Sequence, residues 1–210
     1  DAFGGKGMTP STACLFTGTP GAGKTTLMMQ LANAITKSGN VALFNTAEES
    51  LYQIRKVAKR LRLKYGFICG SERMVDELIN NAKKIQEKDP SKQLFIIADS
   101  LQTLDDGKYA NGTINSMTQV RCLEKLCQFA KDTYAIIIVI GQVNKNGELA
   151  GKQVLKHMID AHCHLYVDTD RRSETYGERL FEVQKNRFGC SGIEYVLNMS
   201  AHGFKERIFS

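Results

Sequence analysis

The run Gly18-Thr19-Pro20-Gly21-Ala22-Gly23-Lys24-Thr25 constrains the fold of this chain more than any other stretch. It matches the pattern G-x-x-x-x-G-K-S/T at every fixed position. In this pattern bare backbone N–H groups approach phosphate oxygens, and glycines stand where a Cβ would collide. We therefore expect the run, continued by Thr26, to hold the phosphates of ATP. Lys24 would supply a cation and Thr25 a hydroxyl ligand for Mg²⁺.

The residues on either side of this run suit the motif. Residues 13–17 are apolar enough for a short buried strand, and residues 24–37 repeat apolar side chains at helical spacing. A bound anion would then lie at a helix N-terminus, where free N–H groups and the helix dipole favour it. The alternative is a glycine-rich turn that binds nothing. The complete motif between a strand and a helix argues against it.

The rest of the chain alternates strands and helices before its pattern changes. Buried strands are expected at 41–46, 67–69, 94–99 and 135–140, and helices at 51–63, after an N-cap at Ser71, and at 117–131. Segments 162–167, 179–184 and 193–199 alternate apolar and polar residues, as antiparallel strands do. The fold class predicted is α/β, with a mostly parallel central sheet and antiparallel C-terminal strands, and residues 1–210 are expected to form a single domain.

Polar residues follow several of the parallel strands, where ligands bind in such sheets. Asp99 ends one strand and is expected to support Mg²⁺, although a strand-end Asp also caps turns. Glu48 or Glu49 would orient and polarise the attacking water, and the other would cap the following helix. Gln142 would sense the γ-phosphate, unless it is an ordinary loop residue.

Lys185 and Arg187 lie two residues apart, so they share one face of a strand. Both side chains have the length and charge to reach a phosphate, in the same subunit or in a neighbouring one. A solvent-exposed basic edge explains the spacing equally well.

Composition narrows the class of protein. The chain is 42% apolar and 24% charged, has a net charge of +6 and a pI of about 9.0, and shows no apolar run of membrane-spanning length and no signal peptide. The positive charge suits a polyanionic partner or a solubilising surface. Six scattered cysteines favour reduced thiols in a cytoplasmic protein over a disulfide framework or a zinc site. His162 and His164 share a strand face, but no further metal ligand is evident beside them.

Five segments, in this order, resemble the RecA-type ATPase core of the bacterial RadA (Sms) family. They are the phosphate loop, Glu48-Glu49-Ser50 with Gln53-Ile54, the run 98–103, the stretch 147–160, and Lys185-Asn186-Arg187-Phe188-Gly189. The last segment is the most specific to the family, and the phosphate loop is the least. The resemblance covers the whole chain.

The resemblance implies a hexameric ring related to DnaB-type helicases that hydrolyses ATP between subunits and moves on single-stranded DNA in recombination and repair. By position, Glu48 matches the catalytic carboxylate, Gln142 the γ-phosphate sensor, and Lys185 with Arg187 the pair donated into the neighbour's site. The loops 105–115 and 144–152 match DNA-contacting loops. Their candidate DNA-binding residues are Lys108, Tyr109, Lys145 and Lys152.

The sequence departs from the family in three respects. The zinc module and the Lon-like domain of RadA have no counterpart in these residues, Gln142 stands where RadA has His, and Lys152-Gln153 replaces a Pro-Lys pair. Two other functions therefore stay open, namely a DnaB-like replicative helicase core and an ATP-switched scaffold that hydrolyses little ATP.

Overall fold

The computed structural model describes residues 3, 7–142 and 152–206. One nine-stranded sheet has the order β3-β2-β4-β5-β1-β6-β7-β8-β9. The parallel strands are β1 (Ala13–Gly18), β2 (Val41–Thr46), β3 (Ile68–Gly70), β4 (Leu94–Asp99), β5 (Ile136–Gln142) and β6 (Ala161–Val167). The antiparallel strands are β7 (Arg179–Asn186), β8 (Ile193–Ser200) and β9 (Gly203–Glu206). The predicted fold class is confirmed. The segment 162–167, predicted among the antiparallel strands, lies at the junction, because β6 pairs parallel with β1 and antiparallel with β7.

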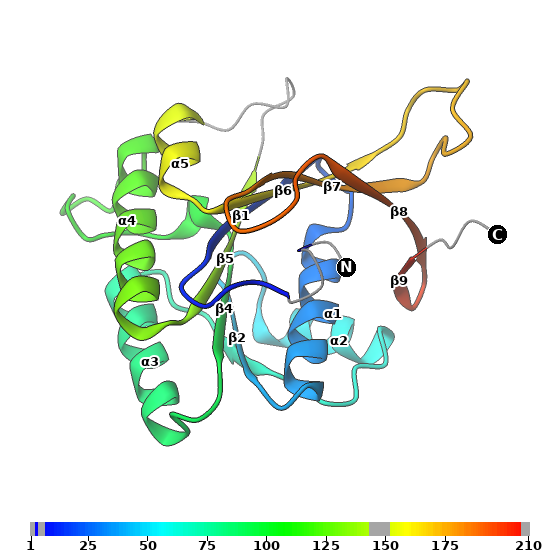
Figure 1. Cartoon of the computed structure of the whole chain (residues 1–210). Coiled ribbons are helices and arrows are strands. Elements are labelled where there is room, and N and C mark those ends of the chain that lie inside the picture. Colours follow the sequence, from blue (N-terminus) through cyan, green and yellow to red (C-terminus); the bar gives the residue numbers. More distant parts are fainter. Residues whose placement is uncertain (1–2, 4–6, 143–151, 207–210) are drawn as a thin grey trace.

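Helices cover both faces of the parallel part of the sheet (Figure 1). One face carries α1 (Lys24–Lys37) and α2 (Leu51–Arg60), and the other carries α3 (Val75–Lys88), α4 (Ser116–Thr133) and α5 (Lys152–Met158). Two apolar cores result, one on each side of the sheet. Burial on both faces explains the unbroken apolar run of β5, since its side chains from Ile136 to Ile140 are all buried.

The start of α3 differs from the prediction, because the helix begins at Val75 and Ser71 does not cap it. Met74 and Asp105 form an isolated parallel bridge. The Asp105 N–H donates to the Arg73 carbonyl at 2.8 Å, and the Val75 N–H donates to the Asp105 carbonyl at 2.9 Å. Residues 71–74 are therefore held extended by a loop distant in sequence, which a local pattern does not reveal.

The last strand was not expected either. β9 returns to α1, where the Gln30 side chain accepts from the Phe204 N–H at 2.7 Å and donates to the Phe204 carbonyl at 3.2 Å. The Phe204 ring is buried against the phosphate loop, since a Cβ on Gly23 would lie 2.7 Å from it. Helix α5 and the short 3₁₀ helix η1 (Leu101–Thr103) are further unpredicted elements. Among the described residues, none of the helices has the length and apolarity to cross a lipid bilayer.

Candidate functional site

A cavity of about 380 Å³ lies at the carboxyl edge of the parallel strands. The residues that line it come from the phosphate loop and from the ends of β2, β4 and β5: Gly18, Pro20, Gly21, Gly23, Lys24, Thr25, Thr26, Glu48, Asp99, Ile140 and Gln142. The backbone φ is +76° at Gly21 and +103° at Gly23, a left-handed conformation that glycine adopts without strain. The structure thus brings the phosphate loop, the Glu48 and Asp99 carboxylates and Gln142 to one site.

Lys24 and Thr25 form hydrogen bonds with other residues of the same site. The Lys24 ammonium donates to the carbonyls of Gly18 at 2.9 Å and Thr19 at 3.2 Å. Burial lowers the pKa of Lys24, while Asp99 and Glu48 oppose that shift. The Thr25 hydroxyl donates to Asp99 Oδ2 at 2.7 Å. Two oxygen groups expected near Mg²⁺ are therefore in direct contact across the cavity.

The carboxylates here are poorly compensated. Burial, together with the nearby Glu48 and Glu49, raises the pKa of Asp99 to about 6, while the Thr25 hydrogen bond and the Lys24 charge oppose the rise. The pKa of Glu49 is raised as well, by burial and by Glu48. A divalent cation would relieve this repulsion. The described residues hold no cluster of three His, Cys, Asp or Glu ligands. Mg²⁺ takes one or two protein ligands and completes its shell with water and phosphate, and the oxygens of Thr25 and Asp99 are of the kind that it binds.

Glu48 is fixed by two donors on one carboxylate oxygen. Ser100 Oγ donates to Glu48 Oε1, and Gln142 Nε2 donates to the same atom at 2.8 Å. Gln102 in turn bonds the Gln142 backbone twice, accepting from its N–H at 3.2 Å and donating to its carbonyl at 3.3 Å. Ser100 and Gln102 were not singled out from the sequence. The sequence signal that could have identified them is their position in the run 98–103, one and three residues after Asp99.

Lys185 and Arg187 lie away from this cavity. Lys185 Nζ donates to the carbonyls of Lys156 at 2.8 Å and Ile159 at 2.6 Å, and Arg187 forms an ion pair with Asp160 at 3.0 Å. The Arg187 N–H also donates to the Asp160 carbonyl, at the residue before β6 begins. The phosphate loop lies near the other end of β6, because Gly18 pairs with Leu165. Leu165 is five residues after Asp160, which corresponds to roughly 16 Å along the strand at 3.3 Å per residue.

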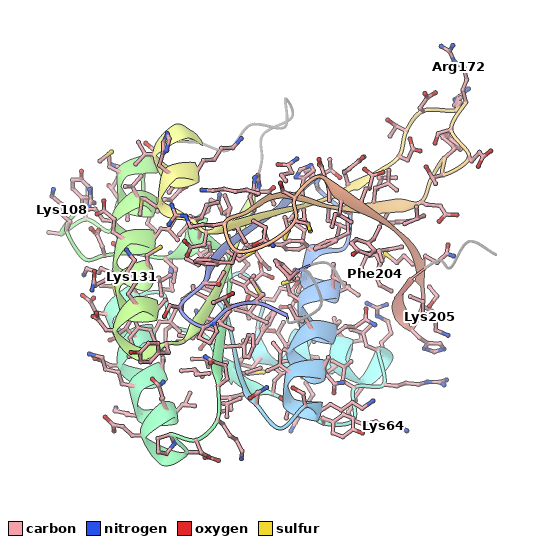
Figure 2. The ribbon with its side chains drawn as sticks, viewed as in Figure 1. Lys64, Lys108, Lys131, Arg172, Phe204 and Lys205 are labelled. Atoms are coloured by element: carbon pink, nitrogen blue, oxygen red, sulfur yellow. The ribbon has the colours of Figure 1, made fainter. Side chains whose placement is uncertain are left out.

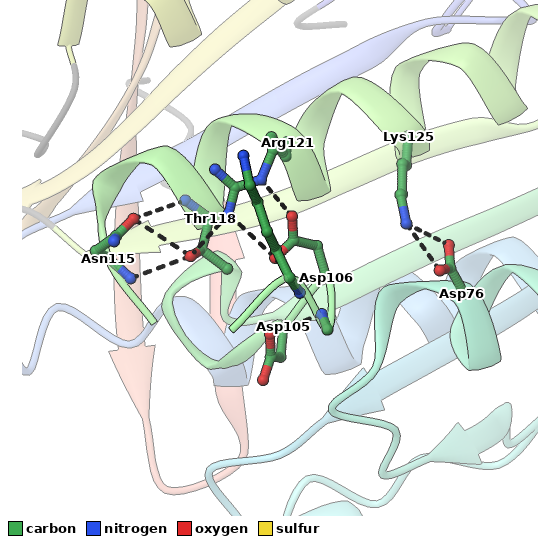
Figure 3. Close-up of polar contacts among 9 residues, drawn as sticks. Asp76, Asp105, Asp106, Asn115, Thr118, Arg121 and Lys125 are labelled. Atoms are coloured by element: carbon green, nitrogen blue, oxygen red, sulfur yellow. Dashed lines mark hydrogen bonds and ion pairs between the residues drawn. The ribbon is translucent and has the colours of Figure 1, made fainter. Parts of the chain in front are cut away.

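The loop 105–115 is attached firmly to α4 (Figure 3). Arg121 reaches from α4 to both oxygens of Asp106 and donates to the Thr118 hydroxyl at 3.4 Å. Its guanidinium also lies 5.5 Å from the centre of the Tyr109 ring. Lys108 is exposed and Tyr109 partly so. Of the other two candidate DNA ligands, Lys145 lies outside the described residues, and Lys152 begins α5 with its side chain undescribed.

His162 and His164 both contact the Thr17 hydroxyl, His162 through Nε2 at 2.8 Å and His164 through Nδ1 at 2.8 Å. Burial lowers the pKa of His162 to about 4, so the ring is neutral at pH 7. This arrangement explains both histidines as hydrogen-bonded groups beneath the phosphate loop. Four of the six cysteines are buried, and Cys69 and Cys190 are exposed.

Sequence comparisons link the chain to two groups of proteins. Residues 11–173 match the family described as "Schlafen group 3, DNA/RNA helicase domain". The DNA repair protein RadA of Haemophilus influenzae is 36% identical over 204 residues, which make up 96% of this chain and 42% of that protein. The DNA repair protein RadA of Brucella abortus is 33% identical over 210 residues, or 98% and 43%. The chain therefore spans less than half the length of these relatives.

Solved structures with a similar fold are more distant in sequence. A DnaB-like replicative helicase, solved in a study of its interactions with primase, has a TM-score of 0.80 at 17% identity, with 93% of this chain and 57% of that chain covered. A KaiC-like protein of Pyrococcus horikoshii has a TM-score of 0.76 at 17% identity, with 99% and 97% covered. A separately solved ATPase domain has a TM-score of 0.80 at 16% identity, with 94% and 85% covered. These likenesses show a RecA-like ATPase fold.

Proposed function

Because the chain belongs to the family of the Schlafen group 3 DNA/RNA helicase domain and has the RecA-type core of bacterial RadA, we propose that it is an ATP-driven motor acting on single-stranded DNA. One observation carries the proposal. The phosphate loop, Asp99, Glu48 and Gln142 come from four separate segments and line one cavity. We treat residues 1–210 as one ATPase domain of a cytoplasmic protein.

The phosphate loop would bind the triphosphate of ATP through the backbone of residues 18–26 and through Lys24. The Lys24 ammonium would move from the Gly18 and Thr19 carbonyls to the β and γ phosphates. Thr25 and Asp99 would hold Mg²⁺, which would neutralise part of the phosphate charge. The hydrogen bond from Thr25 to Asp99 supports this role, because it shows that the two oxygens lie close together in the cavity.

Glu48 would orient the water that attacks the γ-phosphate and draw its proton. Its second oxygen, Oε2, is left for this work, because Ser100 and Gln142 both bond Oε1. Gln142 would report the γ-phosphate, since its amide contacts the same carboxylate that handles the water. Of the two adjacent glutamates, these contacts favour Glu48 as the catalytic one.

The position of Arg187 favours assembly into a ring. An arginine that acts on the phosphates of its own subunit must reach the cavity, and Arg187 lies at the opposite end of β6. Its side chain is 57% exposed despite the ion pair with Asp160. We therefore place Arg187 and Lys185 at the site of a neighbouring copy, in a homo-oligomer of hexameric type.

The loop beside α4 would contact single-stranded DNA through Lys108 and Tyr109. Arg121 occupies one side of the Tyr109 ring, so base stacking would use the other side. Attachment to α4 through Asp106 holds both candidate residues in place, which lowers the entropy lost on binding.

Steady-state ATP hydrolysis with and without a single-stranded oligonucleotide tests the proposal. We expect turnover that needs Mg²⁺ and rises several-fold with DNA, while the Lys24→Ala variant binds no ATP and stays inactive. ATP binding without turnover, with or without DNA, would instead show a nucleotide-switched scaffold. Turnover that is unaffected by DNA would show that the chain is an ATPase and would contradict the proposed motor acting on DNA.

A further inference from the structure

The excess positive charge of this chain is concentrated in one segment. The sequence holds 28 Lys and Arg against 22 Asp and Glu, a net charge of +6. Six of those basic residues lie within residues 51–70, which contain no acid at all: Arg55, Lys56, Lys59, Arg60, Arg62 and Lys64. The net charge of this segment therefore equals that of the whole chain, and the remainder is balanced. General solubility would not require such a concentration.

These residues form α2 and the turn that connects it to β3, and all six basic side chains are exposed. The helix is well defined, since Ser50 and Gln53 form a capping box at its start. Its single fully buried side chain is Ile54. Lys64 lies at the lower edge of the molecule, on the side of α1 and α2 (Figure 2).

A groove of about 730 Å³ runs between α2 and the segment that leads into β3. Apolar side chains line it, including Leu51, Ile54, Ala58, Leu63 and Phe67. Tyr52, 75% exposed, stands at its side, and Arg55 is the basic residue that lines it directly. β3 is the outermost strand of the sheet, so no further strand in the described chain covers this edge.

We propose that this groove binds an acidic peptide segment of a partner protein that carries apolar anchor residues. Its basic rim consists of Arg55, which lines the groove, and Lys59, one turn further along α2 and exposed. The apolar lining requires apolar side chains in the ligand, and the rim requires carboxylates. A helix or strand with apolar residues on one face and acids on the other satisfies both. The surface is separate from the ATP site, and this inference is independent of the proposed motor function.

Two other occupants fit less well. Single-stranded nucleic acid would use the basic residues and the two aromatic side chains of the groove, Tyr52 and Phe67. The rest of the apolar lining is aliphatic and offers no stacking surface for bases. A second copy of this chain would bring the same +6 segment with an otherwise balanced surface, so it offers no net negative charge to match.

Selection from a phage-displayed library of random twelve-residue peptides, with the whole 210-residue chain as the target, tests this proposal. We expect the selected peptides to be enriched in Asp and Glu together with Leu or Phe. The most enriched sequence, synthesised with a fluorophore, should bind with an affinity that falls as salt rises, because the rim is exposed.

Two pairs of substitutions locate the binding surface. Arg55→Glu with Lys59→Glu reverses the rim, and we expect at least a tenfold loss of affinity for the peptide. Lys83→Glu with Lys84→Glu reverses two exposed charges on α3 and serves as the matched control, with affinity unchanged. Tyr52→Ser tests the apolar side of the groove without altering charge and should weaken binding as well. Thermal unfolding of each variant shows that it is folded.

Three results would overturn the proposal. One is a selection without acidic enrichment, and another is equal peptide affinity in the rim variant and the α3 control. The third is a rim variant that loses binding of a fluorescent single-stranded oligonucleotide, or that sediments as a smaller species, while peptide affinity is unchanged. That result would assign the surface to nucleic acid or to a second copy.

Discussion

Glu48 and Glu49 are adjacent in sequence but differ in their surroundings. Glu48 accepts from Ser100 and Gln142 through one oxygen, whereas the N–H of Glu49 donates back to the Thr46 hydroxyl at 3.3 Å. The sequence identified the pair as candidates and left the choice to the family resemblance. The hydrogen bonds favour Glu48, because they hold its carboxylate between the ends of β4 and β5.

Replacement of Glu48 by glutamine should separate binding from hydrolysis. The amide oxygen can still accept from Ser100 and Gln142, but it cannot take a proton from water. We expect ATP affinity to be close to that of the wild type and turnover to fall by about 10²–10⁴-fold, as for loss of a general base. Titration with a fluorescent nucleotide and a single-turnover assay measure the two effects. Glu49→Gln is the control, and a larger loss in that variant would reverse the assignment.

Asp99 should make stability depend on pH when nucleotide and metal are absent. Its folded pKa of about 6 lies above the ordinary value of 3.8, so folding disfavours the ionised form. Stability should therefore rise as pH falls from about 7 toward 4, where the folded chain takes up the proton first. Asp99→Asn, neutral throughout, should be more stable at pH 8 by about 2–3 kcal/mol. Its advantage should disappear near pH 4.

Chemical denaturation of both proteins at pH 8, 6 and 4 measures this effect. Addition of Mg²⁺ and ATP at pH 8 should reverse the order, because the carboxylate then gains a cation. An Asp99→Asn variant that is less stable than the wild type at pH 8 without ligands would show that Asp99 is compensated in the folded state.

Among the secondary-structure elements, local patterns predicted those that carry a continuous apolar run or an apolar repeat at helical spacing. The strand 94–99 and the helix 24–37 were predicted with the bounds that the structure has. The start of α3 was missed because Asp105 holds residues 73–75, and β9 was missed because Gln30 of α1 pairs with it. In both cases hydrogen bonds to one distant residue set the structure, and such bonds leave no periodic pattern of apolar residues in the sequence.

The link between β4 and β5 was also invisible to local patterns. Gln102 in η1 bonds the N–H and the carbonyl of Gln142 and thereby sets where the Gln142 amide meets Glu48. We expect Gln102→Ala to lower the turnover number about tenfold, the equivalent of one hydrogen bond of about 1.4 kcal/mol, with little change in the KM for ATP. The factor by which DNA stimulates turnover should also be smaller in this variant, because η1 leads into the loop 105–115.

A matched control exists at the other end of β4. Gln93 also bonds backbone groups, donating to the carbonyls of Leu94 at 3.3 Å and Tyr134 at 2.6 Å, but far from the cavity. Gln93→Ala should affect thermal stability and leave kinetics unchanged. Gln102→Glu keeps the acceptor and should recover part of the turnover. If Gln102→Ala and Gln93→Ala lose the same amount of turnover, Gln102 has only a structural role.

For the molecule as a whole, the sequence placed four groups at one sheet edge correctly because the carboxyl ends of parallel strands coincide. It could not decide whether Arg187 acts within its own subunit, since that depends on the register between β6 and β7. The register places Lys185 opposite His162, near the start of β6, while the phosphate loop adjoins Leu165 near its end. A role for Arg187 in catalysis therefore requires a second copy.

The last prediction tests that requirement by mixing two inactive proteins. Arg187→Ala should bind ATP normally and lose most of its turnover, since an arginine that stabilises the transferred phosphoryl group contributes roughly 10³–10⁵ in rate. Lys24→Ala should lose ATP binding while keeping its own arginine. In a mixed ring, some interfaces join an intact phosphate loop to an intact Arg187, so activity should reappear on mixing and follow the fraction of such interfaces. Asp160→Asn is the control, because it removes the partner of Arg187 within the subunit and leaves the arginine in place. Normal turnover by Arg187→Ala, or full activity in a monomer isolated by sedimentation, would contradict both the shared site and the ring.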